Sequence, residues 1–257
     1  MKRAPALAVS EARGIRYLHL GGDAIQSAMR IDDPYALALD YTRCVMAVLL
    51  FHPRPREVLM IGLGGGSLAK FFHRRFRAAR VSAIELDARV VVAAREHFAL
   101  PPDDAHLRVE VGDGARALMP ECCDLLLVDG FDDGEQVPGL ASRAFYDAAW
   151  LALSEPGAMV LNFMSDDPRL DLYLRRVERA FGGAVLCLPA LTDPNLIVFA
   201  LKGAPPRLAW HALRVRAGRL EDRFALPFRR YVAGLGLMNP HTKQDLIITP
   251  DTNGGAR

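Results

Sequence analysis

Residues 58–68, VLMIGLGGGSL, decide the fold class of this 257-residue chain. The first four letters form a short apolar run typical of a buried strand, and the residues after Ser67 have the spacing of a helix. In a strand–turn–helix context, glycines allow a tight turn and a close approach of backbone to ligand, and the free N–H groups of the following helix attract electron-rich groups. The stretch therefore predicts a nucleoside-binding turn formed by Gly62, Gly64 and Gly66.

The same alternation of apolar runs and helical segments extends to about residue 201. Strands are expected at 58–62, 81–85, 107–111, 124–129 and 158–163, with helices between them, and residues 185–201 are expected to add an antiparallel pair. Strands that alternate with helices form a parallel sheet covered on both faces. The predicted fold class is therefore α/β, a doubly wound, mostly parallel seven-stranded sheet of Rossmann-like type.

Two further segments flank this predicted sheet. Residues 15–31 predict a β-hairpin around a GGD turn, and residues 35–51 a core-facing helix. After two prolines at 205–206, the arginine-rich residues 207–232 predict a helical extension with a solvated basic face. We therefore divide the chain into an N-terminal hairpin and helix segment (1–52), a nucleoside-binding α/β domain (53–203) and a helical C-terminal extension (204–257).

Composition restricts the classes of partner. A net charge of +2 gives no strong preference for nucleic acid, whose phosphates reward a concentrated basic face. No segment offers about 18 uninterrupted apolar residues, so no membrane span is expected. The four cysteines form no CxxC pair and no histidine stands at metal-ligand spacing, so neither a disulfide framework nor a metal site is expected. A soluble protein of the reducing cytoplasm, without metal, is the simplest interpretation.

Three acids follow successive predicted strands. Glu85 ends the second strand, about 20 residues after the glycine turn, where nucleoside-binding folds place an acid against the ribose hydroxyls. Asp113 and Asp129 end the third and fourth strands, and Asp129 opens the acidic stretch DGFDDG that includes Asp132. Ligands of open α/β sheets bind outside the carboxyl ends of the strands. The three acids are therefore expected to converge on one crevice.

These motifs together resemble those of the spermidine synthase family of aminopropyltransferases, which share the fold of class I methyltransferases that use S-adenosylmethionine (AdoMet). The resemblance covers about residues 15–202 and rests on VLMIGLGGGSL (58–68), IELD (84–87), VGDGA (111–115) and VDGFDDG (128–134). It implies a donor with a sulfonium nucleoside, either decarboxylated AdoMet or AdoMet, and an amine or polyamine acceptor. Family members often assemble through the N-terminal segment, so the resemblance also implies a homodimer.

The resemblance implies a role for each matched residue. Glu85 would hold the ribose hydroxyls, and Asp113 with Gly114 the adenine side of the nucleoside. Asp129 would be the catalytic acid–base residue. Substrate binding would fall to the second carboxylate of the acidic motif and to two residues of the N-terminal segment, namely Asp132, Gln26 and Tyr41.

The chemistry of amine alkylation gives Asp129 the same role. A neutral amine must attack a carbon beside a sulfonium sulfur, so the enzyme needs a carboxylate that orients the amine and accepts its proton in a dry pocket.

Departures from the family pattern keep alternatives open. The family carries an aspartate in the glycine turn that holds the ammonium of decarboxylated AdoMet, and here Gly65 stands in its place. A carboxylate at that position would repel the carboxylate of AdoMet, so Gly65 makes an AdoMet-dependent N-methyltransferase an alternative function. Gly130 and Phe131 replace two serines of the acidic motif, and Leu191 and Thr192 stand near an expected tyrosine. A non-catalytic nucleoside-binding protein is the third interpretation.

Overall fold

A seven-stranded sheet forms the centre of the protein. The structure is a computed structural model that describes residues 6–22, 25–132 and 135–249, the side chains of residues 131–132 and 135–136 excepted. In spatial order the strands are β11 (Val185–Pro189), β12 (Asn195–Lys202), β10 (Leu153–Met164), β7 (Cys123–Val128), β4 (Glu57–Ile61), β5 (Arg80–Glu85) and β6 (Leu107–Val111). The pairs among β10, β7, β4, β5 and β6 are parallel, and β12 lies antiparallel to both of its neighbours. The predicted fold class is confirmed.

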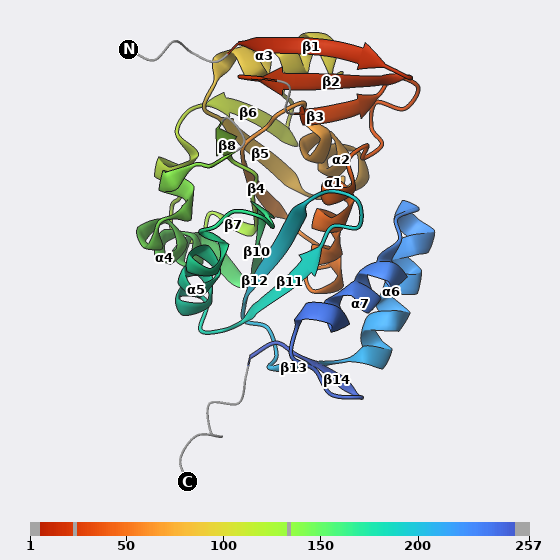
Figure 1. Ribbon diagram of the computed structural model, residues 1–257, viewed down its shortest axis with the longest axis vertical. Coiled ribbons are helices and arrows are strands. Elements are labelled where there is room, and N and C mark those ends of the chain that lie inside the picture. Colours follow the sequence, from red (N-terminus) through yellow and green to blue (C-terminus); the bar gives the residue numbers. More distant parts are fainter. Residues whose placement is uncertain (1–5, 23–24, 133–134, 250–257) are drawn as a thin grey trace.

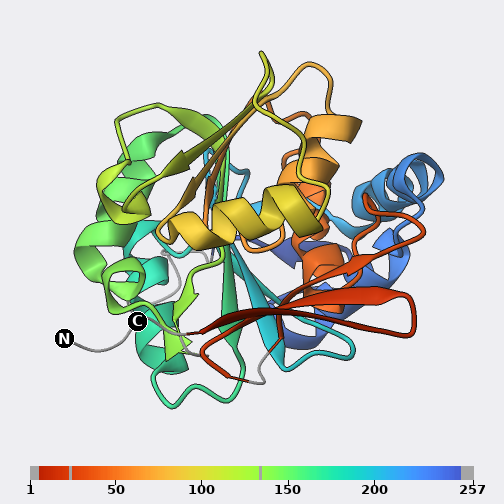
Figure 2. The ribbon, with the colours of Figure 1, turned by 90° about the horizontal axis from the view of Figure 1, so that it is seen from above.

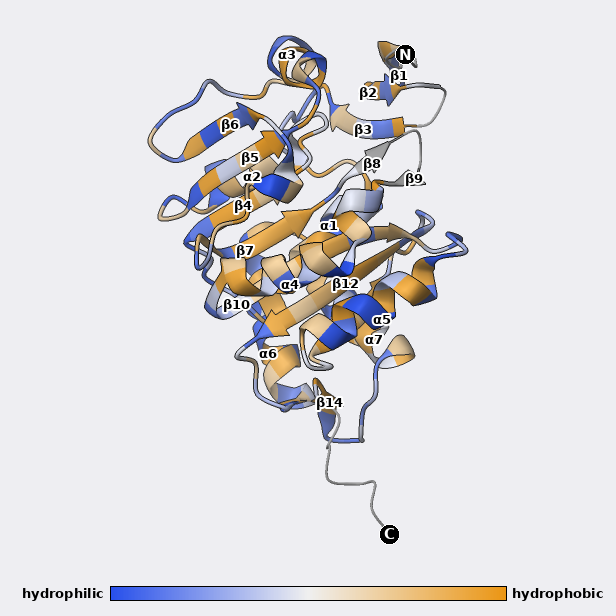
Figure 3. Cartoon of the chain, turned by 90° about the vertical axis from the view of Figure 1, so that its left-hand side faces the viewer, coloured by the Kyte–Doolittle hydropathy of each residue, from blue (hydrophilic) through white to orange (hydrophobic). Residues whose placement is uncertain are grey.

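Helices cover both faces of this sheet because the strands are apolar on both sides. Val58 and Met60 of β4 pack into one core cluster, and Leu59 and Ile61 into another. The first cluster contains α2 (Ser67–Arg75), and the second contains α4 (Arg143–Ala152) and α5 (Leu170–Ala180). Figure 2 shows these helices on opposite sides of the strands, and Figure 3 shows how apolar the strands are. Burial on both faces is what a parallel sheet requires.

The chain reverses its direction of growth between β4 and β7. From β4 it moves to β5 and β6 on one side, and it then returns to place β7 on the other side of β4. The loops after β4 and β7 therefore diverge and leave a crevice at the carboxyl ends of the strands. The two ends touch there, since the Asp129 N–H donates to the Ile61 carbonyl at 2.9 Å.

A small N-terminal sheet lies over that end of the molecule (Figure 1). Strands β2 (Ile15–Leu20) and β3 (Ile25–Arg30) form the predicted hairpin, and an unpredicted strand, β1 (Leu7–Ala12), makes the sheet three-stranded and antiparallel. Leu18 and Met29 of this sheet pack against Val90 and Ala93 of α3 (Ala88–His97) and against Phe98. The sequence analysis missed β1 because a polar edge strand lacks an apolar pattern.

The predicted helix over residues 35–51 is wrong in its first turn. Helix α1 spans Asp40–Val45 and continues as the 3₁₀ helix η1 (Met46–Leu50), while Leu39 is extended. The N–H of Tyr41 in the first turn of α1 donates to the Asp193 carboxylate from a distant loop. This tertiary contact satisfies an N–H group in the first turn and so favours a helix that begins at Asp40. No local sequence pattern reveals it.

The C-terminal extension is helical, as predicted. Helices α6 (Trp210–Phe224) and α7 (Phe228–Met238) are separated at Ala225, which has a φ of +56°, and the short strands β13 (Arg207–Ala209) and β14 (Asp245–Ile247) pair beside them. The largest core cluster contains Val48, Phe199 and Phe228, one from each predicted segment. The division at residues 52 and 203 stays a prediction. In the described part of the chain, no helix has the length and hydropathy to cross a membrane.

Candidate active site

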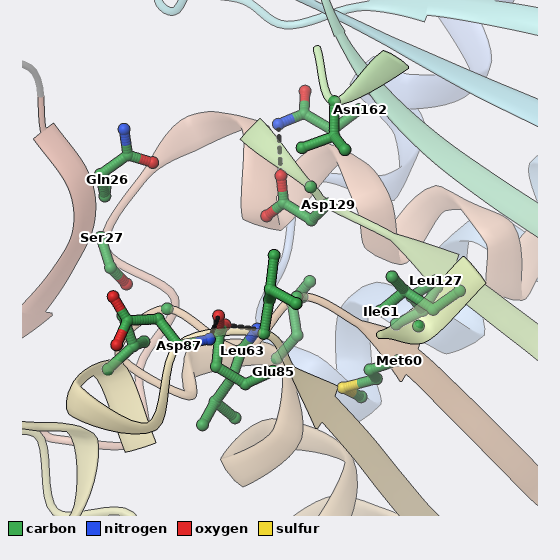
Figure 4. A pocket seen from close by; sticks show the side chains of 18 of the residues that line it. Gln26, Ser27, Met60, Ile61, Leu63, Glu85, Asp87, Leu127, Asp129 and Asn162 are labelled. Carbon is green, nitrogen blue, oxygen red and sulfur yellow. Dashed lines mark hydrogen bonds between the residues drawn. The ribbon is translucent and has the colours of Figure 1, made fainter. Parts of the chain in front are cut away.

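A cavity of about 1120 Å³ opens at the carboxyl ends of β4, β5 and β7. Pockets for one small ligand usually measure roughly 300–1,000 Å³, so this one has room for a nucleoside donor and an acceptor together. Figure 4 shows Asp129 and Asn162 on one side of the cavity and Gln26 and Ser27 of β3 on another. Most of the predicted site residues line it, namely Gln26, Tyr41, Gly62, Gly64, Glu85, Asp113, Gly114 and Asp129.

The glycine turn follows β4 directly and touches the backbone of Asp129. Gly62 has a φ of +93°, and a Cβ there would lie 2.1 Å from the Asp129 carbonyl oxygen. Only glycine can therefore bring these two segments so close. Gly66 lies outside the cavity lining. With a φ of +72° it precedes α2 and packs against Leu100, so it shapes the turn and does not face the ligand space.

Strand β3 of the N-terminal sheet closes over the turn at Gly65. A Cβ on Gly65 would lie 2.8 Å from Ser27 Oγ and 2.9 Å from Phe98 Cδ1. The Ser67 hydroxyl holds the same strand by donating to the Ala28 carbonyl at 3.3 Å. An aspartate at position 65 would require these neighbours to move.

Glu85 contacts the glycine turn, whereas Asp87 contacts a helix. Glu85 Oε2 accepts the Leu63 N–H at 2.9 Å, and Oε1 accepts the Asp87 N–H at 3.0 Å (Figure 4). A carboxylate has about four acceptor sites, so two remain for ligand hydroxyls. The Asp87 carboxylate caps α3 through the Arg89 N–H at 2.9 Å and pairs with the Arg89 side chain. Of the two acids, only Asp87 is paired with an arginine, so Glu85 stays the predicted ribose acid.

Asp113 lies at the exposed end of the cavity. Its carboxylate accepts the Ala115 N–H at 3.0 Å at the start of the 3₁₀ helix η2 (Gly114–Arg116) and pairs with Arg116 at 3.3 Å. Gly114 packs so closely that a Cβ there would lie 2.4 Å from Ile61 Cγ2. Asp113 therefore both caps a turn and faces the cavity.

Two donors hold the carboxylate of Asp129. The Tyr41 hydroxyl donates to Oδ2 at 3.0 Å, and the Asn162 amide donates to Oδ1 at 2.9 Å. Burial raises the pKa of Asp129 above its ordinary value, and the two hydrogen bonds reduce this shift. Burial and the charge of Asp129 raise the pKa of Tyr41 well above its ordinary value, which keeps the phenol neutral and able to donate. The carboxylate is thus oriented from both sides.

The sequence analysis missed three polar residues of this region. Asn162 lies in β10, and its carbonyl oxygen accepts the Asn195 amide at 2.9 Å, with both residues buried. Asp193, on the loop between β11 and β12, lines the cavity and accepts the Tyr41 N–H at 2.9 Å. Asn162 could have been noticed in the sequence, because it is a polar residue inside the apolar run AMVLNF. Nothing in the sequence marks Asn195 or Asp193 as a site residue.

Two short strands follow β7 in the region of the acidic motif. Strand β8 (Phe131–Asp132) pairs with β9 (Glu135–Gln136), while Asp133 lies outside the described residues. The side chain of Asp132 is not described, so its role in binding the amine stays a prediction. A Cβ on Gly130 would lie 2.3 Å from Leu140 Cδ1, so packing against Leu140 accounts for the glycine at this position.

Comparisons with known proteins place the chain among transferases of one fold. No family model matches it. It is 38% identical over 246 residues to a polyamine aminopropyltransferase from Chromobacterium violaceum, and the match covers 95% of this chain and 94% of that protein. A probable spermidine synthase from Corynebacterium glutamicum has a similar structure, with a TM-score of 0.70, 17% identity and coverage of 90% and 91%. Human methyltransferase-like protein 13, solved with SAH, gives a TM-score of 0.63 at 24% identity, with coverage of 75% and 93%.

Proposed function

Because the chain belongs to the polyamine aminopropyltransferase family, we propose that it transfers an aminopropyl group from decarboxylated AdoMet to an amine or polyamine. The family membership confirms the resemblance found in the sequence. The observation that carries the proposal within the structure is the oriented carboxylate of Asp129, whose backbone lies against the glycine turn.

The donor fits the side of the cavity formed after β4, β5 and β6. The turn at Gly62 and Gly64 allows the methionine-derived part to approach the backbone, and the two open acceptor sites of Glu85 suit a pair of ribose hydroxyls. Asp113 and Gly114 would bound the adenine side. The bound donor supplies an electrophilic carbon beside its sulfonium sulfur.

Asp129 would act on the acceptor. The neutral amine nitrogen attacks the carbon attached to sulfur, the new N–C bond forms as the C–S bond breaks, and the thioether leaves with the electron pair. The excess proton on nitrogen passes to the Asp129 carboxylate. Tyr41 and Asn162 keep that carboxylate aimed at the amine, and Gln26 would bound the acceptor from the N-terminal sheet.

Calorimetry with decarboxylated AdoMet, AdoMet and methylthioadenosine, followed by a product assay with aliphatic amines, tests the proposal. We expect the decarboxylated donor to bind more tightly than AdoMet, and we expect methylthioadenosine to form when an amine is added. Binding of none of the three nucleosides would refute every transferase interpretation. Binding without turnover on any amine would favour a non-catalytic nucleoside-binding protein.

One observation favours a second candidate, an AdoMet-dependent N-methyltransferase. Position 65 carries no carboxylate, and Ser27 and Phe98 occupy the space beside it. The carboxylate of AdoMet would meet no repulsion at this point. The calorimetry and the product assay separate the two candidates. Tighter binding of AdoMet than of decarboxylated AdoMet, together with a methylated product, would favour the methyltransferase and refute the aminopropyltransferase.

A further inference from the structure

A second cavity lies in the C-terminal extension. It has a volume of about 560 Å³, which is the size of a pocket for one small ligand. Its walls come from α6, α7 and the loop between α7 and β14. Figure 1 shows α6 and α7 on the β11 side of the molecule, away from the N-terminal sheet. The sequence analysis predicted only a solvated basic face for these helices, and the proposed function makes no use of them.

Apolar and small residues keep this second cavity open between the two helices. Trp210 of α6 and Val232 of α7 are buried residues of its lining, and the Trp210 indole N–H donates to the Thr242 carbonyl at 3.0 Å. This hydrogen bond fixes the loop against α6. A Cβ on Gly236 of α7 would have Trp210 Cη2 as its nearest atom, 4.0 Å away. The absence of a side chain at this position therefore leaves space for a ligand.

Among the described residues, four basic side chains and no acid line this cavity. They are Arg214 of α6, Arg229 of α7, and His241 and Lys243 of the loop. The candidate active site has the opposite character, since five acids and one arginine of the described residues line it. An anion is therefore attracted to the second cavity and repelled by the first.

Donor groups in this second cavity remain available for a ligand. Within the part of the chain that the structure describes, the exposed side chains of Arg214 and Lys243 form no hydrogen bond and no ion pair. Arg229 is paired with Glu221, whose carboxylate also accepts the Arg229 backbone N–H at 3.0 Å. His241 Nδ1 donates to a backbone carbonyl at 3.0 Å, which leaves its Nε2 for a ligand. Two positive charges on different segments thus have no partner inside the described chain.

We propose that this second cavity binds a small anion that carries a chain of phosphate groups. Arginine holds phosphate through two parallel N–H donors, and lysine holds it as a point charge. Cations on separate segments suit an anion with several phosphates, because each cation can contact a different one. A net charge of +2 gives the chain no extended basic face, so a compact anion fits better than a nucleic acid. The inference is independent of the proposed function, since the two cavities share no lining residue.

Calorimetry with inorganic tripolyphosphate at low ionic strength tests the inference on the full chain. Arg214→Ala and Lys243→Ala should each weaken binding about 10-fold or more, because each removes a charged hydrogen bond. Arg219→Ala is the matched control. Arg219 is an exposed arginine of the same helix as Arg214, it lies outside the cavity lining, and its removal makes the same change in net charge, so it should leave the affinity unchanged.

Equal weakening by Arg214→Ala and Arg219→Ala would overturn the inference, because it would show general attraction to a basic helix and no site. Absence of tripolyphosphate binding by the wild type would overturn it as well. Tighter binding of a short single-stranded oligonucleotide than of tripolyphosphate would replace the small anion by a nucleic acid. ATP distinguishes two sources of the phosphate chain. Tighter binding of ATP that Arg214→Ala weakens would assign the ligand to nucleotides, and equal binding would assign it to the phosphate chain alone.

Discussion

The proposed donor side and the proposed acceptor side of the cavity are built in different ways. The donor side consists of Gly62, Gly64, Glu85 and Asp113, which follow three adjacent parallel strands within a stretch of about fifty residues. The acceptor side combines side chains from α1, β10, the end of β7 and the β11–β12 loop, and its hydrogen bonds join residues up to 152 positions apart.

Under the proposed function, this difference separates binding of the donor from binding and activation of the acceptor. The donor side depends on backbone geometry and on two acids, Glu85, which accepts the Leu63 N–H of the glycine turn, and Asp113. The acceptor side depends on a connected set of side chains that orient Asp129. Changes on the two sides should therefore alter different kinetic constants.

Asp129→Asn should have the largest effect. The amide cannot accept the proton of the attacking amine, so kcat should fall about 10²- to 10⁴-fold. Donor affinity should stay within about threefold, because Asp129 lies on the acceptor side. Steady-state kinetics and calorimetry with the donor measure the two quantities, and Asp166→Asn, which changes an exposed acid outside the cavity lining, serves as the control. Wild-type turnover in Asp129→Asn would remove Asp129 from the catalytic role.

Gly62→Ala should break the contact between the two sides. Its Cβ would lie 2.1 Å from the Asp129 carbonyl oxygen at a φ of +93°. We expect a loss of about 3 kcal/mol in the free energy of unfolding, together with loss of donor binding. Gly182→Ala is the matched control, since Gly182 has a φ of +59° with no atom within 4 Å, and should cost about 1–2 kcal/mol. Equal losses of stability in urea unfolding would contradict the contact.

Glu85→Gln should weaken donor binding without changing turnover at saturating donor. Glutamine keeps one carbonyl oxygen, but its NH₂ group would face either the Leu63 N–H or the Asp87 N–H. Both of these groups are donors, so one of the two hydrogen bonds is lost. We expect donor Kd to rise roughly 10- to 30-fold in calorimetry. A fall in kcat with unchanged donor affinity would assign Glu85 to the acceptor side instead.

Asn195→Asp should shift the pH dependence of activity. A carboxylate at position 195 cannot donate to Asn162, so it draws the Asn162 amide N–H away from Asp129. That hydrogen bond lowers the pKa of Asp129, which burial and, to a smaller extent, the charge of Glu85 already raise. Because Asp129 must be ionised to accept a proton, the acid limb of kcat/KM should move to higher pH, by about one unit.

Tyr41 and Asp193 also lie near Asn195. The substitution leaves in place the hydrogen bond from the Tyr41 hydroxyl to Asp129 and the one from the Tyr41 N–H to Asp193. Asn239→Asp changes another buried asparagine, one that binds the Cys187 backbone and does not line the cavity, and should not move the acid limb. Reduced activity at every pH, with an unshifted acid limb, would limit Asn195 to a structural role.

The sequence alone determined the sheet and the donor side. Apolar runs between helical segments predict strands buried on both faces, and a turn with φ values open only to glycine is visible as GLGGG. Acids at strand ends are found by counting, because parallel strands bring their carboxyl ends to one edge. Glu85, Asp113 and Asp129 were identified in this way.

The acceptor side could not be predicted from the sequence, because it is assembled by contacts between distant segments. The start of α1, the buried Asn162–Asn195 pair and the place of Asp193 depend on hydrogen bonds between segments 33 to 152 residues apart. Asn195 opens an expected strand and Asp193 lies just before it, and no periodicity marks either of them as a site residue. The physical reason is that a buried polar side chain is defined by its partner, and the partner comes within reach only when the chain has folded.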